Sequence, residues 1–338
     1  MQIVRRIVQI AVIALLILIP LFNFYGIKVE QKDDYAIENS KALRAIHLLF
    51  KGQDRSQVIE LSHQVKGSVW TINFFGFRIS DPLAVLESTT TAVYFYLPML
   101  LSLLVPLFFT VTLGRVYCGW LCPMHLLLEI NDKMRRLLEK IGYHTRDVRF
   151  KKQTKFWVLL IGLLAAFLAG RPLLSLIYPP AVISRELFYK IYNGFWSNGL
   201  LLIGAICFVE LILSRRWWCR YICPGGAVYT ALSRWKWLKI ERNDQFCDQC
   251  GDCLPVCPYD LKPMTRELKA DCDQCGLCIS VCKPGALKYT FGFNRTPNGE
   301  NPNVAKSRKP KSEIRKKEFQ SWLVYFKIYR RRISVSGF

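Results

Sequence analysis

Long apolar runs alternate with basic and polar segments along this chain of 338 residues. A helix needs about 20 mainly apolar residues to cross a lipid bilayer. Four runs approach or reach that length, and they cover residues 7–25, 91–113, 156–178 and 198–213. Residues 26–90, between the first two runs, are mixed in polarity. The pattern therefore predicts an all-α domain with four transmembrane helices over residues 1–236.

The basic residues predict how these helices are oriented. Lysine and arginine gather in the segments after the second and fourth runs, at residues 115–155 and 214–245. Because positively charged loops stay in the cytoplasm, we expect both segments and both chain termini there, with residues 26–90 in the periplasm. The first run opens like a signal peptide, but no small-residue cleavage site follows it. We expect an uncleaved helix.

The net charge of +22 would suit either nucleic acid or the cytoplasmic face of a membrane. With four expected membrane helices, the lipid membrane is the better partner and no nucleic acid is expected. Residues 294–338 form a basic C-terminal tail in which aromatic and basic side chains are interleaved near the end. Such a tail could lie on anionic lipid as an amphipathic helix or dock on a partner subunit.

Eight of the 13 cysteines lie in two matching runs, CDQCGDCLPVCP and CDQCGLCISVCKP. Two, two and three residues separate the cysteines of each run. This is the spacing of 4Fe–4S ligands in which the fourth cysteine of each run binds the other cluster. The first cluster would be bound by Cys247, Cys250, Cys253 and Cys282, and the second by Cys272, Cys275, Cys278 and Cys257. Zinc also uses paired C-x2-C motifs, but two runs of four favour iron–sulfur clusters.

This part of the chain resembles a two-cluster bacterial ferredoxin over residues 244–290. We therefore expect residues 237–293 to form a small α+β ferredoxin-like domain. Cysteines at metal-ligand spacing do not predict disulfides, so the domain should lie in a reducing compartment.

A second cysteine motif occurs twice, as GRVYCGWLCP at residues 114–123 and RRWWCRYICP at residues 215–224. Each copy follows a pair of expected helices, which predicts two parallel repeats. A pseudo-twofold axis along the membrane normal would bring the four thiols of the C-x3-C-P motifs together at the inner face. These thiols belong to Cys118, Cys122, Cys219 and Cys223.

Three roles are open for the C-x3-C-P thiols. On a helix, the i, i+4 spacing would place both thiols of a motif on one face. Four converging thiols could hold a further metal, or two pairs could cycle between dithiol and disulfide. They could also be small side chains that pack a helix end. His125 and Glu129 follow the first motif at a four-residue spacing, and both could accept protons if burial raises the pKa of the glutamate.

Paired C-x3-C-P motifs on four apolar helices, followed by two 4Fe–4S runs, resemble the NapH family of membrane ferredoxin-type proteins. The cores of the NosR and CcoG families are similar. The resemblance covers residues 1–290 and implies a quinol dehydrogenase subunit in the bacterial inner membrane. It would carry two 4Fe–4S clusters, use quinol as substrate, and pass electrons to a partner redox subunit of the ferredoxin or cytochrome type.

The motifs leave other functions open. The chain could be a maturation protein, such as a metal-ion reductase of the CcoG kind, or an assembly scaffold with structural clusters. It contains no C-x-x-C-H motif for c-type haem and no P-loop. Terminal substrate chemistry is therefore expected in a different subunit.

Overall fold

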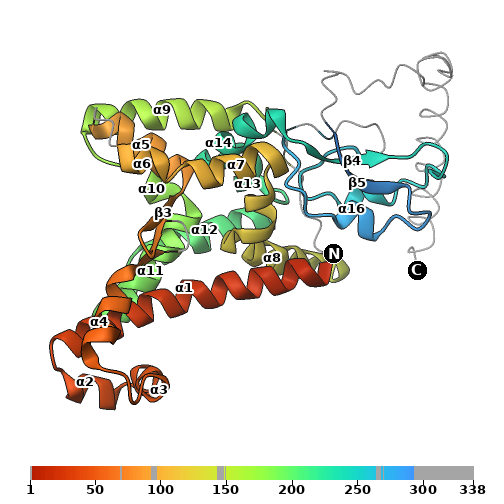
Figure 1. Ribbon diagram of the computed structural model, residues 1–338. Helices are drawn as coiled ribbons and strands as arrows, with labels where there is room; N and C mark the ends of the chain where they lie inside the picture. The colour runs from red at the N-terminus through yellow and green to blue at the C-terminus, as the bar shows by residue number, and fades with distance from the viewer. Residues whose placement is uncertain are drawn as a thin grey trace. The chain divides into compact units, whose positions relative to one another are not determined.

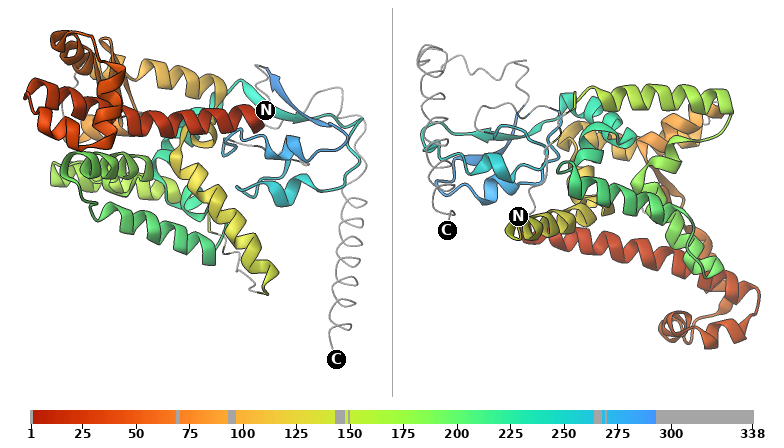
Figure 2. Two further views of the ribbon diagram at one scale, coloured as in Figure 1. Left: turned by 90° about the horizontal axis from the view of Figure 1, so that it is seen from below. Right: turned by 180° about the vertical axis from the view of Figure 1, so that it is seen from behind.

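The computed structural model describes residues 2–68, 71–92, 97–142, 148, 150–263, 268 and 270–292. Contacts group Met1–Gly292 into one compact unit. In this unit a cysteine-rich module with a two-stranded sheet lies at the same end of the helical part as the start of the first helix (Figures 1 and 2). The basic tail, residues 294–338, lies outside the described residues.

The helical part has two halves, each of which ends in a C-x3-C-P motif. The first half consists of α1 (Gln2–Glu30), α5 (Pro82–Ala92), α6 (Leu97–Leu101), α7 (Leu104–Leu113), the π-helical turn η1 (Tyr117–Leu121) and α8 (Pro123–Lys140). The second half consists of α9 (Thr154–Ala169), α10 (Leu174–Ile177), α11 (Pro179–Asn193), α12 (Gly199–Ile212), α13 (Trp217–Tyr221), α14 (Pro224–Leu232) and the short 3-10 turn η2 (Ser233–Trp235).

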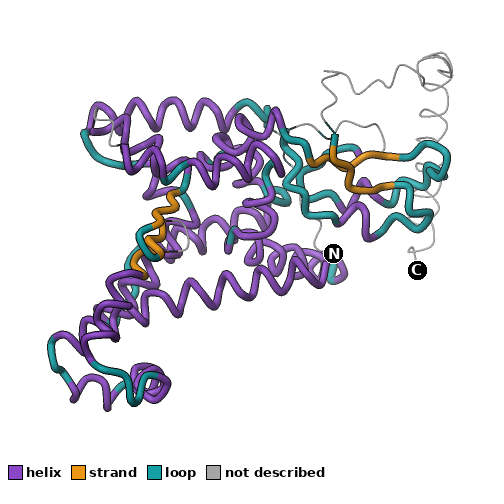
Figure 3. The backbone as a smooth tube through the Cα atoms, in the orientation of Figure 1, coloured by secondary structure: helices purple, strands orange, loops and turns teal. Residues whose placement is uncertain are grey.

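A small subdomain is inserted between α1 and α5. It contains α2 (Asp34–Asn39), α3 (Lys41–Leu49), α4 (Arg55–Gln64) and a three-stranded antiparallel sheet of β1 (Val65–Ser68), β2 (Thr71–Phe74) and β3 (Phe77–Ser80). The helices bury Leu43, Ile46 and Val58 against Tyr25 and Val29 at the far end of α1. The sheet then carries the chain back to the start of α5 (Figure 3).

Helices of one half pack against helices of the other half. The long first helix of each half packs against a proline-started helix of the other, because α1 contacts α11 and α9 contacts α5. The last helices pair in the same crossed way, α8 with α12 and α14 with α7. A parallel duplication explains this pairing, since equivalent helices then occupy equivalent places about one axis.

Three of the four expected apolar helices have different bounds in the structure. The first runs over Gln2–Glu30 instead of 7–25. The second is not one helix over 91–113, because α5 begins at Pro82 and a turn separates α6 from α7. The third ends at Ala169, where Gly170 adopts a left-handed conformation, instead of continuing to 178. The fourth, α12, agrees closely with the expected 198–213.

The helices α5 and α11 have sequences too polar to appear as apolar runs. In α5 the hydroxyls of Ser88, Thr89, Thr90 and Thr91 bond back to carbonyls of their own helix. The buried carboxylate of Glu87 accepts the backbone N–H groups of Leu174 and Ser175 in α10. The segment between the third and fourth apolar runs, residues 179–197, is mostly α11, whose Glu186 accepts backbone N–H groups at the start of α12 in the same way.

Among the described residues, length and composition identify one helix, Gln2–Glu30, as able to cross a membrane. Three further apolar segments are shorter, at Leu97–Leu113, Thr154–Ala169 and Gly199–Ile212. These four segments correspond to the four runs of the sequence. Only the first meets the length of about 20 residues that a spanning helix needs.

The cysteine-rich module is a small α+β unit. β4 (Leu238–Arg242) pairs with β5 (Leu287–Phe291) in an antiparallel ladder, and two single-turn helices, α15 (Cys253–Val256) and α16 (Leu277–Ser280), pack against each other beside it. Its core contains Ile240, Leu261 and Leu287 together with three of the cysteines.

The Glu87 contact gives a test of how the halves are joined. Glu87→Ala leaves two backbone N–H groups of α10 without their acceptor, and Leu174 is buried. We expect the unfolding free energy to fall by about 1–3 kcal/mol, the cost of an unsatisfied buried donor. Thermal unfolding in detergent measures it. Ser88→Ala is the matched control, because that hydroxyl bonds only within α5; equal effects of the two changes would contradict the joining role of Glu87.

Candidate redox site between the helical repeats and the cysteine-rich module

Each C-x3-C-P motif folds as a short turn followed at once by a new helix. Cys122 and Cys223 are the N-cap residues of α8 and α14, with ψ of 118° and 115°. The residue before a proline is forced out of the α-helical region, and proline is well suited to the first helical position. The expected arrangement of two thiols at i, i+4 on one regular helix is therefore wrong, because the proline breaks the helix at the second cysteine.

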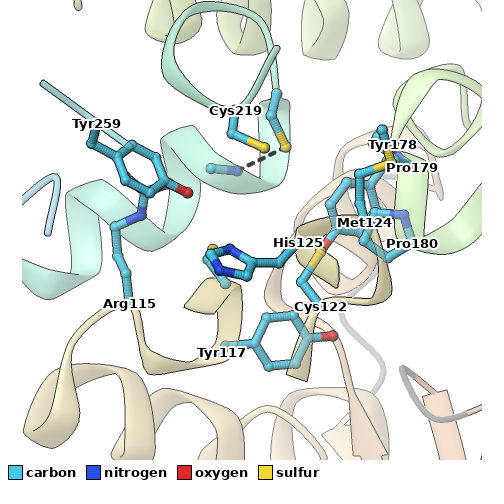
Figure 4. A pocket seen from close by; sticks show the side chains of 13 residues that line it. Arg115, Tyr117, Cys122, Met124, His125, Tyr178, Pro179, Pro180, Cys219 and Tyr259 are labelled. Carbon is cyan, nitrogen blue, oxygen red and sulfur yellow. Dashed lines mark hydrogen bonds between the residues drawn. The ribbon is translucent and has the colours of Figure 1, made fainter. Parts of the chain in front are cut away.

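The structure nevertheless brings all four C-x3-C-P thiols to one cavity. Cys118 and Cys122 line it from the first repeat, and Cys219 and Cys223 from the second. Figure 4 shows the His125 ring near Cys122 and below Cys219, with Arg115 and Tyr259 on the side away from Tyr178 and Pro179. The remaining lining residues are Tyr117, Met124, Tyr178, Pro179, Pro180 and Gly226.

Three helices begin at this cavity, each with a proline in its first turn: α8, α11 and α14. A fourth, α5, begins beside it at Asp81, whose carboxylate contacts two of the lining tyrosines. The N-terminal end of a helix carries a partial positive charge and free N–H groups. The cavity therefore favours negative charge on its occupants, such as a thiolate sulfur.

The four thiols are protonated in their present surroundings. Burial raises the pKa of Cys118, Cys122 and Cys219, and it raises the pKa of Cys223 to about 12. The nearby guanidinium of Arg115 acts in the opposite direction on Cys118 but does not outweigh burial. Oxidation of these thiols must therefore release protons to other groups.

His125 and Glu129 lie together on α8, as their spacing predicts. The imidazole Nε2 is 3.1 Å from a carboxylate oxygen of Glu129, and His125 lines the cavity. Arg5 of α1 donates to the same oxygen at 2.6 Å, and Arg6 pairs with the other. Sequence reasoning missed Arg5 and Arg6, because no local pattern indicates that the start of α1 contacts α8.

The ion pairs change the expected role of Glu129. Burial alone would raise its pKa, but the hydrogen bond with His125 and the charges of Arg5 and Arg6 lower it to about 2. The expectation that burial makes Glu129 a proton acceptor near neutral pH is therefore wrong. Burial also lowers the pKa of His125, with the charge of Arg216 acting in the same direction, so the imidazole is neutral at pH 7.

Three cysteines of the first run and one of the second meet at one place in the module. Cys247, Cys250, Cys253 and Cys282 line one cavity. Cys278 is within electrostatic range of Cys272, Cys257 and Cys253, and Cys272 also acts on Cys275 and Cys257. The crossed sharing of cluster ligands between the two runs stays a prediction from their spacing.

The backbone of the two runs fits an iron–sulfur cluster. In each C-D-Q-C-G segment the glutamine, Gln249 or Gln274, adopts a φ of 57°, and the following glycine is also left-handed. A left-handed glutamine costs roughly 1–2 kcal/mol. Such turns direct successive N–H groups toward a common anion and recur at Fe–S sites. The cost of the left-handed glutamine is explained if each loop surrounds a cluster and directs its N–H groups toward it.

The two runs differ in exposure. Cys272, Cys275 and Cys278 are buried, whereas Cys250 is exposed and Cys247 is half-buried. The second run thus lies inside the molecule and the first lies near its surface.

The second run is packed directly on the first C-x3-C-P turn. Arg115 donates to the carbonyl of Asp271 at 3.1 Å, and Trp120 donates to the carbonyl of Gln274 at 3.0 Å. Lys155, from the start of α9, pairs with the Asp271 carboxylate. Arg115 also lies over the ring of Tyr259, 5.3 Å from its centre. None of these contacts has a sequence signal apart from the proximity of Arg115 to Cys118.

Among the described residues, no three His, Cys, Asp or Glu side chains are grouped closely enough to hold a single metal ion. The C-x3-C-P thiols therefore do not form a group that supports the further metal ion considered from the sequence. A 4Fe–4S cluster is a different case, because each thiolate binds a different iron and the four sulfurs surround a larger space.

Comparisons with known proteins match a 4Fe-4S binding profile to the two helical repeats, outside the eight cysteines of the module. A family profile described as a 4Fe-4S binding domain matches residues 95–141 and again residues 195–242. Each match contains one C-x3-C-P motif. The chain is 31% identical over 239 residues to the methylamine utilization ferredoxin-type protein MauN of Methylorubrum extorquens, covering 66% of this chain and 80% of MauN.

A second relative is the ferredoxin-type protein NapH of Haemophilus influenzae, 30% identical over 185 residues, which are 53% of this chain and 60% of NapH. No solved structure matches the chain. The fold and the matched motifs define an iron–sulfur electron-transfer protein. The chain belongs to the family of ferredoxin-type proteins that includes MauN and NapH, which confirms the resemblance drawn from the motifs.

Gly119 tests the packing of the module on the first motif. A Cβ at Gly119 would stand 2.4 Å from the backbone carbonyl oxygen of Asp273, so Gly119→Ala must displace the second run. We expect a lower iron content, with the loss confined to the inner cluster, measured by iron analysis and EPR. Gly204→Ala is the control, because a Cβ there meets nothing within 4 Å. Equal iron and spectra in the two variants would show that the contact is dispensable.

Proposed function

We propose that this protein oxidises quinol in the cytoplasmic membrane and delivers the electrons, one at a time, to a partner redox protein. The observation that carries the proposal is the packing of the second cysteine run on a cavity that holds four thiols from both repeats. A two-electron centre and a one-electron carrier are then neighbours.

We assign the first 4Fe–4S cluster to Cys247, Cys250, Cys253 and Cys282, and the second to Cys257, Cys272, Cys275 and Cys278. When bound, the clusters accept and donate single electrons. The buried group lies next to the cavity, since Cys219 packs against the core that contains Cys272 and Cys278. The group with exposed Cys250 lies nearer the surface. Electrons would enter at the second cluster and leave from the first.

The C-x3-C-P thiols supply the two-electron step. Two thiols can give up two electrons and two protons as an S–S bond forms, and quinol can return both when it reduces that bond. The two electrons then leave singly toward the module. His125 lines the cavity as a neutral imidazole and is the first candidate to accept a proton. Glu129, held by Arg5 and Arg6, fixes the orientation of that imidazole.

The membrane location rests on α1 and on the three shorter apolar segments. We assign both termini and the module to the cytoplasmic side, because lysine and arginine are concentrated on the segments beside the module. The partner is a redox protein that docks near the exposed cluster. The relatives' names connect MauN with methylamine utilization, so a partner in amine oxidation is a second candidate beside a respiratory reductase.

The crossed ligands can be tested one cluster at a time. Cys282→Ser should remove the signal of the surface cluster and leave the inner one, although Cys282 is close in sequence to the inner set. Cys257→Ser should do the reverse. Iron analysis and EPR of anaerobically purified protein measure both. Loss of the inner cluster in Cys282→Ser would contradict the crossed assignment.

The role of the C-x3-C-P thiols can be separated from cluster assembly. Replacing Cys118, Cys122, Cys219 and Cys223 by serine should abolish reduction of the clusters by quinol, because the two-electron centre is lost. Dithionite should still reduce the clusters, which controls for assembly. A quadruple variant that is reduced by quinol at the normal rate would make the motifs structural and would overturn this electron path.

A further inference from the structure

A second buried group of titratable side chains lies beside the thiol cavity. Asp81, at the start of α5, is 3% exposed. Its Oδ2 is 2.9 Å from the hydroxyl of Tyr178 and 3.2 Å from the hydroxyls of Tyr117 and Tyr229. Its Oδ1 accepts the backbone N–H of Leu83 at 2.7 Å. Three tyrosines thus converge on one carboxylate oxygen.

Among the residues that the structure describes, no cation is paired with this carboxylate. In the described part of the chain, the ion pairs include no Lys or Arg that contacts Asp81. Burial raises the pKa of Asp81, and the hydrogen bonds from Leu83, Tyr178, Tyr229 and Tyr117 offset only part of the rise. A neutral side chain could accept the same hydrogen bonds without the cost of a buried charge. A carboxylate at this buried position is therefore explained if the side chain of Asp81 takes up and releases a proton.

Two of the tyrosines connect Asp81 to the thiols. Tyr117 and Tyr178 line the thiol cavity, and both reach Asp81 with their hydroxyls. The cysteine-rich module meets the same cavity through Arg115 and Tyr259 instead. The route for electrons, toward the module, therefore leaves the thiols by different residues from the route for protons, toward Asp81.

We propose that Asp81 accepts a proton from the C-x3-C-P thiols when they are oxidised, through the hydroxyl of Tyr117 or Tyr178. The inference rests on the proposed function of those thiols. Two S–H bonds break and one S–S bond forms. The two electrons would be taken up one at a time by the 4Fe–4S clusters that the cysteines of the module would hold. One proton goes to His125. The other is taken up by a tyrosine hydroxyl, which gives its own proton to Oδ2 of Asp81.

The test uses the full-length protein with its clusters and compares Asp81→Asn with Asp81→Glu. Asparagine keeps the size and can still accept hydrogen bonds from the tyrosines, but it cannot take a proton. Glutamate disturbs the packing more and keeps the carboxylate. We expect reduction of the clusters by quinol to slow at least tenfold in Asp81→Asn, with a larger solvent deuterium isotope effect, and to recover in part in Asp81→Glu. Dithionite reduction should be unchanged in both variants.

A second measurement does not depend on quinol. A thiol must lose its proton before it attacks a disulfide reagent. Labelling of the four C-x3-C-P thiols with dithiodipyridine, resolved by mass spectrometry, should therefore be about tenfold slower in Asp81→Asn and nearer normal in Asp81→Glu. If labelling is slowed equally in both variants, or is slowed less in Asp81→Asn than in Asp81→Glu, Asp81 has a structural role and the proposal is overturned.

The two hypotheses fail separately. If quinol does not reduce the clusters of the unchanged protein, the proposed function is wrong, and the labelling rates still decide whether Asp81 takes the thiol proton. If quinol reduces the clusters of Asp81→Asn at the normal rate with an unchanged isotope effect, Asp81 is not the acceptor and the electron path stands.

Discussion

The conformation that proline imposes on the residue before it shapes the centre of this protein. Four helices, α5, α8, α11 and α14, begin at a proline, and the preceding residues are Asp81, Cys122, Tyr178 and Cys223. Each of these residues is held outside the helix, so its side chain lies at a helix N-terminus instead of on a helix face. Two thiols, a tyrosine and a carboxylate are brought together in this way. The positive ends of the same helices then surround the thiols.

Duplication explains why the centre has two of each part. The long helices α1 and α9 each bring a basic residue, Arg5 or Lys155, to the helix that follows a C-x3-C-P motif. Their partners, Glu129 and Thr230, stand seven residues after the second cysteine of each motif. The repeats differ where the cysteine-rich module is bound, because Lys155 also pairs with Asp271. An internally symmetric helical part thus becomes asymmetric on one side, and that side faces the second cysteine run.

Buried charge is balanced by short-range partners in this region. Arg115 and Arg216 occupy equivalent places three residues before the first cysteine of each motif, and both are almost completely buried. Arg115 is paired with the module through Asp271, whereas Arg216 donates to the carbonyl of His125 and pairs with Asp132. Removing one partner of such a pair leaves an uncompensated charge in a low-dielectric interior. These pairs therefore hold the module and α8 in fixed positions around the thiols.

Local patterns of residues were enough to predict the type of chemistry, whereas long-range contacts set how the reacting groups meet. Cysteine spacing is local, so the two 4Fe–4S runs and the repeated C-x3-C-P motif could be read directly from the sequence. The apolar runs located the helices but not their ends, because α5 and α11 satisfy polar side chains through contacts with distant backbone, such as Glu87 with α10. Glu129 shows the same limit. Its spacing from His125 predicted a shared face, but its protonation depends on Arg5, 124 residues away. Asp81 had no motif around it, and it became a candidate because three tyrosines from both repeats converge on it, a long-range arrangement that no local pattern encodes.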